Sequence, residues 1–234
     1  MKPEFYPIFI DLRGRAALVV GAGEVGEQKI EPLLEAGAKV TVIAPWAKPA
    51  VAVWAEQGRL TYHARAFEEK DMDAAYFLVI AATDNRAVNK RIFEMAETAQ
   101  RLVNVVDDPP LCNFIVPAIA RSGPIQVAIS SSGRSPTMAG QIKRRIQRDL
   151  LGEDTGRLAS WLGEKREWLK PHLGDFKNKR VFWRAVQDSN IPGLVRSNHL
   201  ATAEQRLLTL LEANLAAAGL PWPEAVERPK RLVV

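Results

Sequence analysis

The strongest indication of the fold is the sequence Ala16-Ala17-Leu18-Val19-Val20-Gly21-Ala22-Gly23-Glu24-Val25-Gly26. Its first part, Ala16–Val20, has no polar residue and is typical of a strand buried on both faces, as in a parallel sheet. Gly21, Gly23 and Gly26 then follow with the G-x-G-x-x-G spacing of a strand-to-helix turn that can bind a dinucleotide. In such a turn the first glycine permits the bend, the second lets a pyrophosphate approach the backbone, and the third lets the helix lie close to the strand.

The residues after the turn complete a βαβ unit. Glu24–Ala36 is expected to be a helix, and the amides at its start, at Glu24 and Val25, would hold the phosphates. Gly37 ends this helix, and Lys39–Ala44 is expected to be the second strand. The complete unit favours nucleotide binding over the alternative, a tight turn without a ligand.

The end of the second strand does not select the cofactor. We expect Ala44 and Pro45 to contact the dinucleotide, but NAD-selective sites usually have an acidic residue here, and the nearest cation is Lys48. The residues alone therefore leave NAD and NADP open.

Strands and helices continue to alternate, which predicts an α/β, Rossmann-like, doubly wound parallel sheet. Ligands of such sheets lie at the carboxyl ends of the strands, where we expect Thr83, Asp84 and Asp107 to meet the glycine turn. The alternative is that Thr83 and Asp84 cap a helix and that Asp107 caps the turn before Pro109. The predicted elements are helices at Trp46–Gln57 and Arg86–Ala99 and strands at Arg59–His63, Tyr76–Ala82 and Leu102–Val106.

The pattern changes after Pro110. Two strand-like pieces, Asn113–Pro117 and Pro124–Ser130, have no helix between them, and Ser135 before Pro136 is a strong helix start. The rest of the chain is predicted to be helical, and Thr202 with Gln205 has the pattern of a capping box. The clearest predicted helices are Thr137–Leu150, Thr155–Lys170, Phe176–Gln187 and Ala203–Ala218.

Composition limits the class of protein. The chain has 234 residues, a net charge of +5 and 47% hydrophobic residues, so a basic globular protein is expected, whose partner could be nucleic acid, a membrane surface or a polyanionic small molecule. No apolar run could span a bilayer, no signal peptide is visible, and the single Cys112 excludes internal disulfides, which together predict a cytoplasmic protein. The three histidines, His63, His172 and His199, do not have metal-ligand spacing, so no metal site is expected.

Five motifs in order carry a resemblance to a known family. They are Pro7-Ile8-Phe9, Val19–Gly26, Ala81-Ala82-Thr83-Asp84, Asn104-Val105-Val106-Asp107 and Ser130–Pro136. Together they resemble the precorrin-2 dehydrogenase family, which is the dehydrogenase/ferrochelatase module of siroheme synthase. The resemblance covers about the first 150 residues and continues more weakly through the helical part.

The resemblance implies an enzyme that oxidises precorrin-2 to sirohydrochlorin with NAD as cofactor. Some members also insert Fe²⁺ into sirohydrochlorin. The family also lacks the acidic residue after the second strand and is homodimeric. The implied domains are a dinucleotide-binding domain (1–112), a dimerisation and substrate region (113–150), a helical domain (151–220) and a loose tail (221–234).

The resemblance also implies roles for particular residues. Asp107 corresponds to the aspartate of the family motif and is the expected catalytic residue, although a swap of roles with Asp108 stays open. The loop has Ser132 where glycine is more usual. The residues expected to contact the tetrapyrrole are Asn113, Ser130, Ser131, Arg134, Ser135 and Lys143.

Charge supports a tetrapyrrole, because precorrin-2 carries eight carboxylates and the helix after Ser135 carries Lys143, Arg144, Arg145 and Arg148. The alternative is an ordinary solvated helix face. Two other functions compete: a nucleotide-sensing regulatory module, and an enzyme of the same fold that acts on another acidic metabolite. No helix-turn-helix pattern is visible, so nucleic acid is not expected as a partner. Trp161, Trp168, Trp183 and Trp222 are expected to pack between helices.

Overall fold

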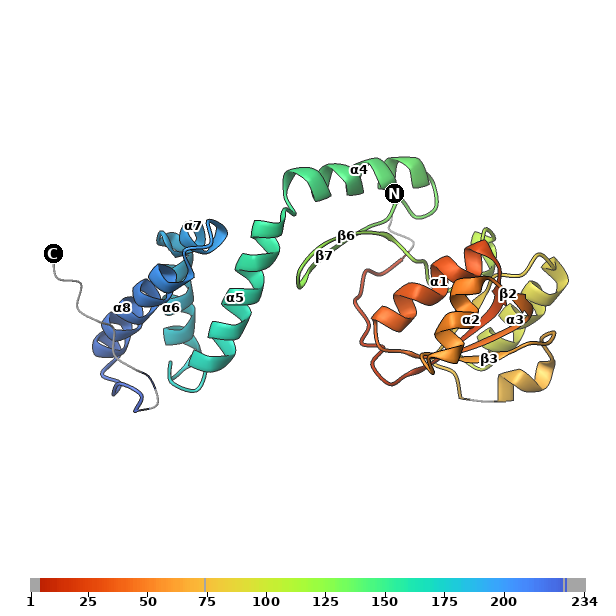
Figure 1. The fold of residues 1–234 in the computed structure, drawn as a ribbon, viewed down its shortest axis with the longest axis horizontal. Helices are drawn as coiled ribbons and strands as arrows, with labels where there is room; N and C mark the ends of the chain where they lie inside the picture. Colours follow the sequence, from red (N-terminus) through yellow and green to blue (C-terminus); the bar gives the residue numbers. More distant parts are fainter. Residues whose placement is uncertain (1–4, 74, 225, 227–234) are drawn as a thin grey trace. The chain divides into compact units, whose positions relative to one another are not determined.

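The computed structural model describes residues 5–73, 75–224 and 226, which form two compact units (Figure 1). The first unit contains the residues up to Val116 together with Ser132–Arg134. The second contains Pro117–Ser131 and the residues from Ser135 onward. The change of unit at Val116 lies close to the domain boundary proposed at 112.

The first unit is a parallel sheet of five strands in the order β3-β2-β1-β4-β5, flanked by helices (Figure 1). The strand order reverses direction between β1 and β4, and this switch point is where doubly wound sheets bind ligands. The Rossmann-like prediction is confirmed. The elements are β1 (Ala16–Ala22), α1 (Glu24–Glu35), β2 (Lys39–Ala47), α2 (Pro49–Glu56), β3 (Thr61–His63), η1 (Glu69–Asp73), β4 (Leu78–Ala81), α3 (Arg86–Thr98), β5 (Leu102–Val105) and η2 (Pro109–Leu111).

Strand β1 is buried on both faces, as its composition predicts. Ala17 and Val19 pack in the cluster that contains Ile30 of α1. Leu18 and Val20 point to the other face and pack in the cluster that contains Ile92 of α3. Because side chains alternate along a strand, an unbroken apolar run is needed to fill both layers.

The predicted helix at Trp46–Gln57 starts too early. Strand β2 continues to Ala47, which pairs with Ala22 after a register shift, and the Lys48 amide donates to the Ala22 carbonyl at 3.0 Å. Helix α2 then begins with Pro49, whose missing N–H is no loss in a first turn. The pairing with the glycine turn therefore keeps Trp46 in the strand.

The prediction of a strand at Asn113–Pro117 is wrong, and β6 begins at Ala118. One isolated backbone bridge, between Asn104 and Cys112, and two side-chain amides hold this segment to β5, and among the described residues no strand ladder continues from it. The Val103 amide donates to Asn113 Oδ1 at 2.7 Å, and Asn104 Nδ2 donates to the Phe114 carbonyl at 3.0 Å.

The second unit begins with an antiparallel hairpin and continues as helices. Gln147 of α4 joins helix to hairpin, because its side chain accepts from the Arg121 amide at 3.0 Å and donates to the Arg121 carbonyl at 2.9 Å. The elements are β6 (Ala118–Ser122), β7 (Ile125–Ile129), α4 (Pro136–Asp149), α5 (Glu153–Leu169), α6 (Phe176–Asp188), α7 (Ile191–Arg196) and α8 (Leu200–Ala218).

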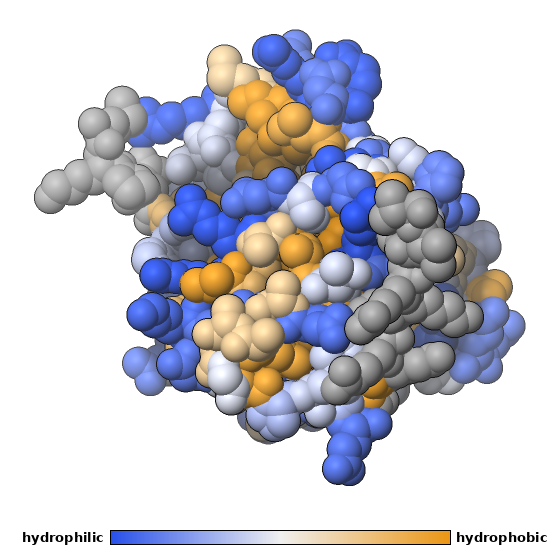
Figure 2. Space-filling model, turned by 90° about the vertical axis from the view of Figure 1, so that its left-hand side faces the viewer, coloured by the Kyte–Doolittle hydropathy of each residue, from blue (hydrophilic) through white to orange (hydrophobic). Residues whose placement is uncertain are grey.

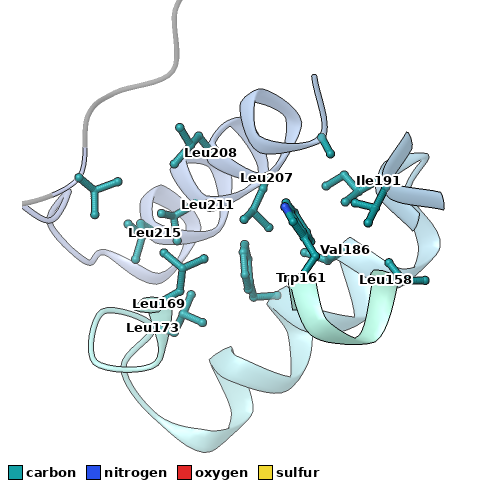
Figure 3. Close-up of a cluster of buried hydrophobic side chains, with 14 residues drawn as sticks. Leu158, Trp161, Leu169, Leu173, Val186, Ile191, Leu207, Leu208, Leu211 and Leu215 are labelled. Carbon is teal, nitrogen blue, oxygen red and sulfur yellow. The ribbon is translucent and has the colours of Figure 1, made fainter. Parts of the chain in front are cut away.

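The helices enclose a core of their own (Figure 3). Leu169, Phe182, Leu207 and Leu211 are completely buried in it. The tryptophans pack as predicted: Trp161 is buried, and Trp168, Trp183 and Trp222 lie against the cluster. None of the helices in the described part of the chain is both long and apolar enough to cross a membrane, and the cytoplasmic location stays a prediction.

Two features of the helical part differ from expectation. Helix α8 begins at Leu200, and the Ala203 amide already donates to the His199 carbonyl at 3.0 Å, so the capping box at Thr202 is wrong. The segment predicted as a loose tail begins packed, because Trp222 Nε1 donates to the Val226 carbonyl at 2.6 Å and Val226 is buried. Residues 225 and 227–234 of that tail lie outside the described residues.

Candidate active site

The three glycines of the turn meet three different surroundings. A Cβ on Gly21, where φ is +103°, would lie 2.2 Å from the Ala82 carbonyl oxygen. A Cβ on Gly26 would lie 2.3 Å from the Gly21 oxygen, so this glycine lets α1 pack on the strand end. A Cβ on Gly23 would meet only the Trp46 ring, at 3.5 Å. The fold therefore requires Gly21 and Gly26, whereas a Cβ on Gly23 would make only an ordinary contact with the Trp46 ring.

Helix α1 begins directly after Gly23, at the edge of a cavity. Gly23 is its N-cap and has no side chain to satisfy the first helical amides. The turn lines a pocket of about 480 Å³ together with the ends of β2 and β4. The predicted cofactor residues Gly21, Gly23, Glu24, Val25, Ala44, Pro45, Thr83 and Asp84 all line it, and Gly26 does not. A pyrophosphate fits this site, because free amides and a glycine without Cβ face the same cavity.

Glu24 does not leave a free carboxylate in the pocket. It forms an ion pair with Lys48, and this contact holds the pKa of the Glu24 carboxyl below its ordinary value. Lys48 Nζ also lies 3.9 Å from Glu27. The nearest cation to the end of β2 is therefore neutralised by acidic residues of α1.

The β4 end of the pocket is held by hydrogen bonds to Asn89, a residue that the sequence pattern did not single out. Asn89, buried on α3, accepts from Thr83 Oγ1 at 2.6 Å and donates to the Thr83 carbonyl at 2.8 Å. Asn85 caps α3 by accepting from the amides of Ala87 and Val88. Asp84 therefore is not the cap, and its side chain borders the cavity. A polar residue on the buried face of a predicted helix was the available signal for Asn89.

Asp107 lines a second pocket, of about 350 Å³, which also contains Thr83 and Asp84. These two residues are common to both pockets, so the dinucleotide pocket adjoins the strand end that carries Asp107. Asp107 is exposed and has a left-handed backbone, with φ at +59°. A non-glycine residue in this conformation is uncommon, and such residues cluster at functional sites.

The two adjacent aspartates differ in their partners. Asp108 lies 3.3 Å from Arg86 Nη2 and is largely buried. Asp107 makes no hydrogen bond or ion pair within the described parts of the chain. Cys112 steadies the same turn by donating to the Val105 carbonyl at 3.2 Å, and burial raises the pKa of its thiol. Asp107 is therefore the carboxylate that is available to a ligand.

Asn113 has a structural position. Its Oδ1 accepts from the Val103 amide, and its Nδ2 donates to Glu97 Oε1 at 2.6 Å and to the Arg101 carbonyl at 2.8 Å. Because both ends of the amide are occupied, we do not include Asn113 among the residues proposed to bind substrate.

The other predicted substrate residues surround the start of α4. Ser135 caps this helix by accepting from the Met138 amide, and Ser131 Oγ accepts from the Ser135 amide at 2.9 Å. The loop between them contains Ser132 and Gly133, both with positive φ, and Arg134, while Ser130 follows β7. Lys143 is exposed on α4.

The charges of α4 divide into two groups. Asp149 lies 3.6 Å from Arg145 and 2.6 Å from Arg148. Lys143 and Arg144 have no acidic partner among the residues that the structure describes. Over the same residues, no three His, Cys, Asp or Glu side chains gather as a metal site would require.

Sequence comparison covers both units. Residues 8–118 match a family described as putative NAD(P)-binding. Residues 122–149 match the central region of sirohaem biosynthesis proteins, and residues 154–211 match the sirohaem synthase dimerisation region. The chain belongs to the siroheme synthase family. The family resemblance drawn from the five motifs is confirmed.

Relatives within the siroheme synthase family are longer than this chain. It is 40% identical over 223 residues to siroheme synthase 1 of Cronobacter sakazakii, covering 95% of this chain and 46% of that protein. It is 38% identical over 210 residues to siroheme synthase of Neisseria meningitidis, covering 90% and 43%. The chain thus spans about half the length of these relatives.

A solved structure shares the fold. SirC, a precorrin-2 dehydrogenase, superposes with a TM-score of 0.72 at 25% identity, covering 86% of this chain and all of that one. The Rossmann-like unit and the helical unit both fall within the siroheme synthase architecture.

Proposed function

We propose that this chain oxidises precorrin-2 to sirohydrochlorin with NAD⁺. The observation that carries the proposal is the arrangement of the first unit, in which the pocket over the glycine turn adjoins, through Thr83 and Asp84, the strand end that presents Asp107. The precorrin-2 dehydrogenase SirC and the siroheme synthases are the proteins that this chain resembles.

The turn supplies the binding site for the cofactor. The first amides of α1 and the backbone of Gly23, which has no Cβ, hold the pyrophosphate, and the switch point between β1 and β4 directs the rest of the dinucleotide toward β5. When bound, NAD⁺ accepts the hydride that dehydrogenation removes.

Asp107 accepts the proton that leaves with the hydride, or holds the ring from which it leaves. The carboxylate is exposed and unpaired within the described residues, whereas Arg86 lies against Asp108. This difference supports a chemical role for Asp107 and a supporting role for Asp108. Loss of a general base lowers the rate about 10²- to 10⁴-fold.

The cations in the middle of α4 attract the substrate carboxylates. Lys143 and Arg144 have no acidic partner in the described part of the chain, and we include Ser130, Ser131, Arg134 and Ser135 as further contacts to the tetrapyrrole. A cationic surface raises the local concentration of a polyanion and is screened by salt.

The helical unit provides the dimer contact. Its residues 154–211 match the dimerisation region of the family. Figure 2 shows apolar side chains between hydrophilic ones on one face of the helical unit. The exposed apolar residues of the unit include Phe176, Val181 and Leu200. We propose a homodimer.

The same site could serve a second reaction, the insertion of Fe²⁺ into sirohydrochlorin. Iron is a substrate of this reaction, and the tetrapyrrole nitrogens provide most of its ligands. Asp107 is the candidate to take up protons from those nitrogens.

An anaerobic spectral assay tests the proposal. Precorrin-2 and NAD⁺ with the purified protein should give the sirohydrochlorin spectrum, and added Fe²⁺ should convert it to that of siroheme. Asp107→Asn should lose turnover at least 100-fold and still bind NAD⁺, and Asp108→Asn is the matched control with a smaller loss. Absence of any spectral change with a protein that binds NAD⁺ would favour a nucleotide sensor instead.

A further inference from the structure

The end of β2 has an aromatic side chain that the core does not use. Trp46 is 62% exposed and belongs to none of the three hydrophobic clusters of the described residues. By contrast Trp54, eight residues later, packs against the cluster around α1. A tryptophan left this exposed on a strand gains little by packing, so its position requires another reason.

The position of Trp46 is fixed by the glycine turn. The pairing of Ala22 with Ala47 and the bond from the Lys48 amide to the Ala22 carbonyl hold the strand beside Gly23. The indole then lies 3.5 Å from the place where a Cβ of Gly23 would be. Trp46 therefore borders the cavity beside the start of α1, where the pyrophosphate is expected.

The neighbouring residues provide no polar contact for the adenosine half of a dinucleotide. Ile43, Ala44 and Pro45 have no hydrogen-bonding side chain, and the Ala44 carbonyl is engaged by Tyr62 Oη at 3.0 Å. Lys48 is paired with Glu24. The end of β2 therefore lacks the acidic residue that usually binds the ribose, and the Trp46 ring lies beside the place where that residue would be.

We propose that the Trp46 indole stacks on the adenine ring of the dinucleotide and is a main determinant of cofactor affinity. A purine offers a flat π face, and stacking on an aromatic side chain needs no hydrogen-bonding group. In this chain the stack replaces the usual acid–ribose contact at the end of the second strand. The inference rests on the proposed binding of NAD.

Binding by calorimetry and fluorescence tests the stack. Trp46→Leu should weaken binding of NAD⁺ and of ADP-ribose about 10-fold or more, and Trp46→Phe, which keeps a π face, should lose much less. ADP-ribose should quench tryptophan fluorescence in the wild type and in the control Trp183→Phe, but not in Trp46→Phe. Nicotinamide mononucleotide should not quench it in any of them.

The outcomes separate this inference from the proposed function. The melting temperature of Trp46→Leu should stay close to that of the wild type, because the residue is outside the core. If the variant folds and binds NAD⁺ within twofold of the wild type, or if ADP-ribose still quenches Trp46→Phe, the stack is refuted and the proposed function stands. If the wild type itself fails to bind NAD⁺, both are refuted.

Discussion

Gly21 and Gly23 both lack a side chain and are two residues apart, yet the structure predicts different consequences of substitution at the two positions. In Gly21→Ala the new methyl carbon would lie 2.2 Å from the Ala82 oxygen, at a backbone φ of +103°. Overpacking costs about 1–3 kcal/mol and the left-handed backbone about 1–2 kcal/mol. The sum, roughly 2–5 kcal/mol, corresponds to a melting temperature lower by about 8–20 °C for a domain of this size.

Gly23→Ala should leave the fold intact and remove the cofactor. The new methyl would meet only the Trp46 ring, at 3.5 Å, which is an ordinary contact. The remaining cost is the weaker N-cap preference of alanine, about 1 kcal/mol at most. The methyl would nevertheless stand where the pyrophosphate must approach, so NAD⁺ affinity should fall at least about 10-fold.

Thermal unfolding followed by circular dichroism and calorimetric titration with NAD⁺ distinguish the two variants. Gly21→Ala should have a clearly lower melting temperature than the wild type. Gly23→Ala should bind NAD⁺ more weakly, with little change in its melting temperature. The reasoning is refuted if Gly23→Ala binds NAD⁺ like the wild type, or if it unfolds at as low a temperature as Gly21→Ala.

Three further predictions concern the support of the site. Arg65 forms two short hydrogen bonds with Asp71 and lowers the pKa of its carboxyl group from the ordinary 3.8. Asp71→Asn should therefore lower the free energy of unfolding of the protein by about 1–3 kcal/mol at pH 7. Urea unfolding should show this difference between variant and wild type shrinking as the pH falls below about 4, and a constant difference would contradict the pair. Asn89→Leu should cost about 1–3 kcal/mol in the same assay and weaken NAD⁺ binding, because the Thr83 hydroxyl and carbonyl lose their bonds to the Asn89 side chain. Unchanged binding would mean that the network does not position the pocket. Burial raises the pKa of Cys112, so iodoacetamide should label it much more slowly at pH 8 in the native protein than in urea, and equal rates would be incompatible with this burial.

The central sheet could be predicted because its signals are local. A strand such as β1 must fill two apolar layers, and the G-x-G-x-x-G spacing fixes the turn that follows. The approximate position of Asp107 also followed, because carboxyl ends of parallel strands share one edge. The sequence did not predict the left-handed backbone of Asp107 or the ion pair between Asp108 and Arg86, because both depend on how the chain turns after β5.

The errors arise where distant contacts override local preference. Trp46 to Ala47 has no strong strand signal, and it is pairing with Ala22 that extends β2. Asn113 begins a run that looks like a strand, but its side chain is bound to β5 and Glu97. The capping pattern at Thr202 was overridden because the chain already turns into α8 at His199. The contacts that fix Ala47 and Asn113 join separate strands and helices, so a window of neighbouring residues does not contain them.

At position 107, the residue that would make the turn most stable differs from the residue that we propose for the chemistry. A glycine there would adopt the left-handed backbone without the penalty of about 1 kcal/mol that an L-residue carries, and it would also stabilise the turn by removing a like charge beside Asp108. Such a chain would be more robust and chemically inert at this edge. A search for thermostable variants by sequence design alone would therefore favour replacing the residue that we propose to carry the chemistry.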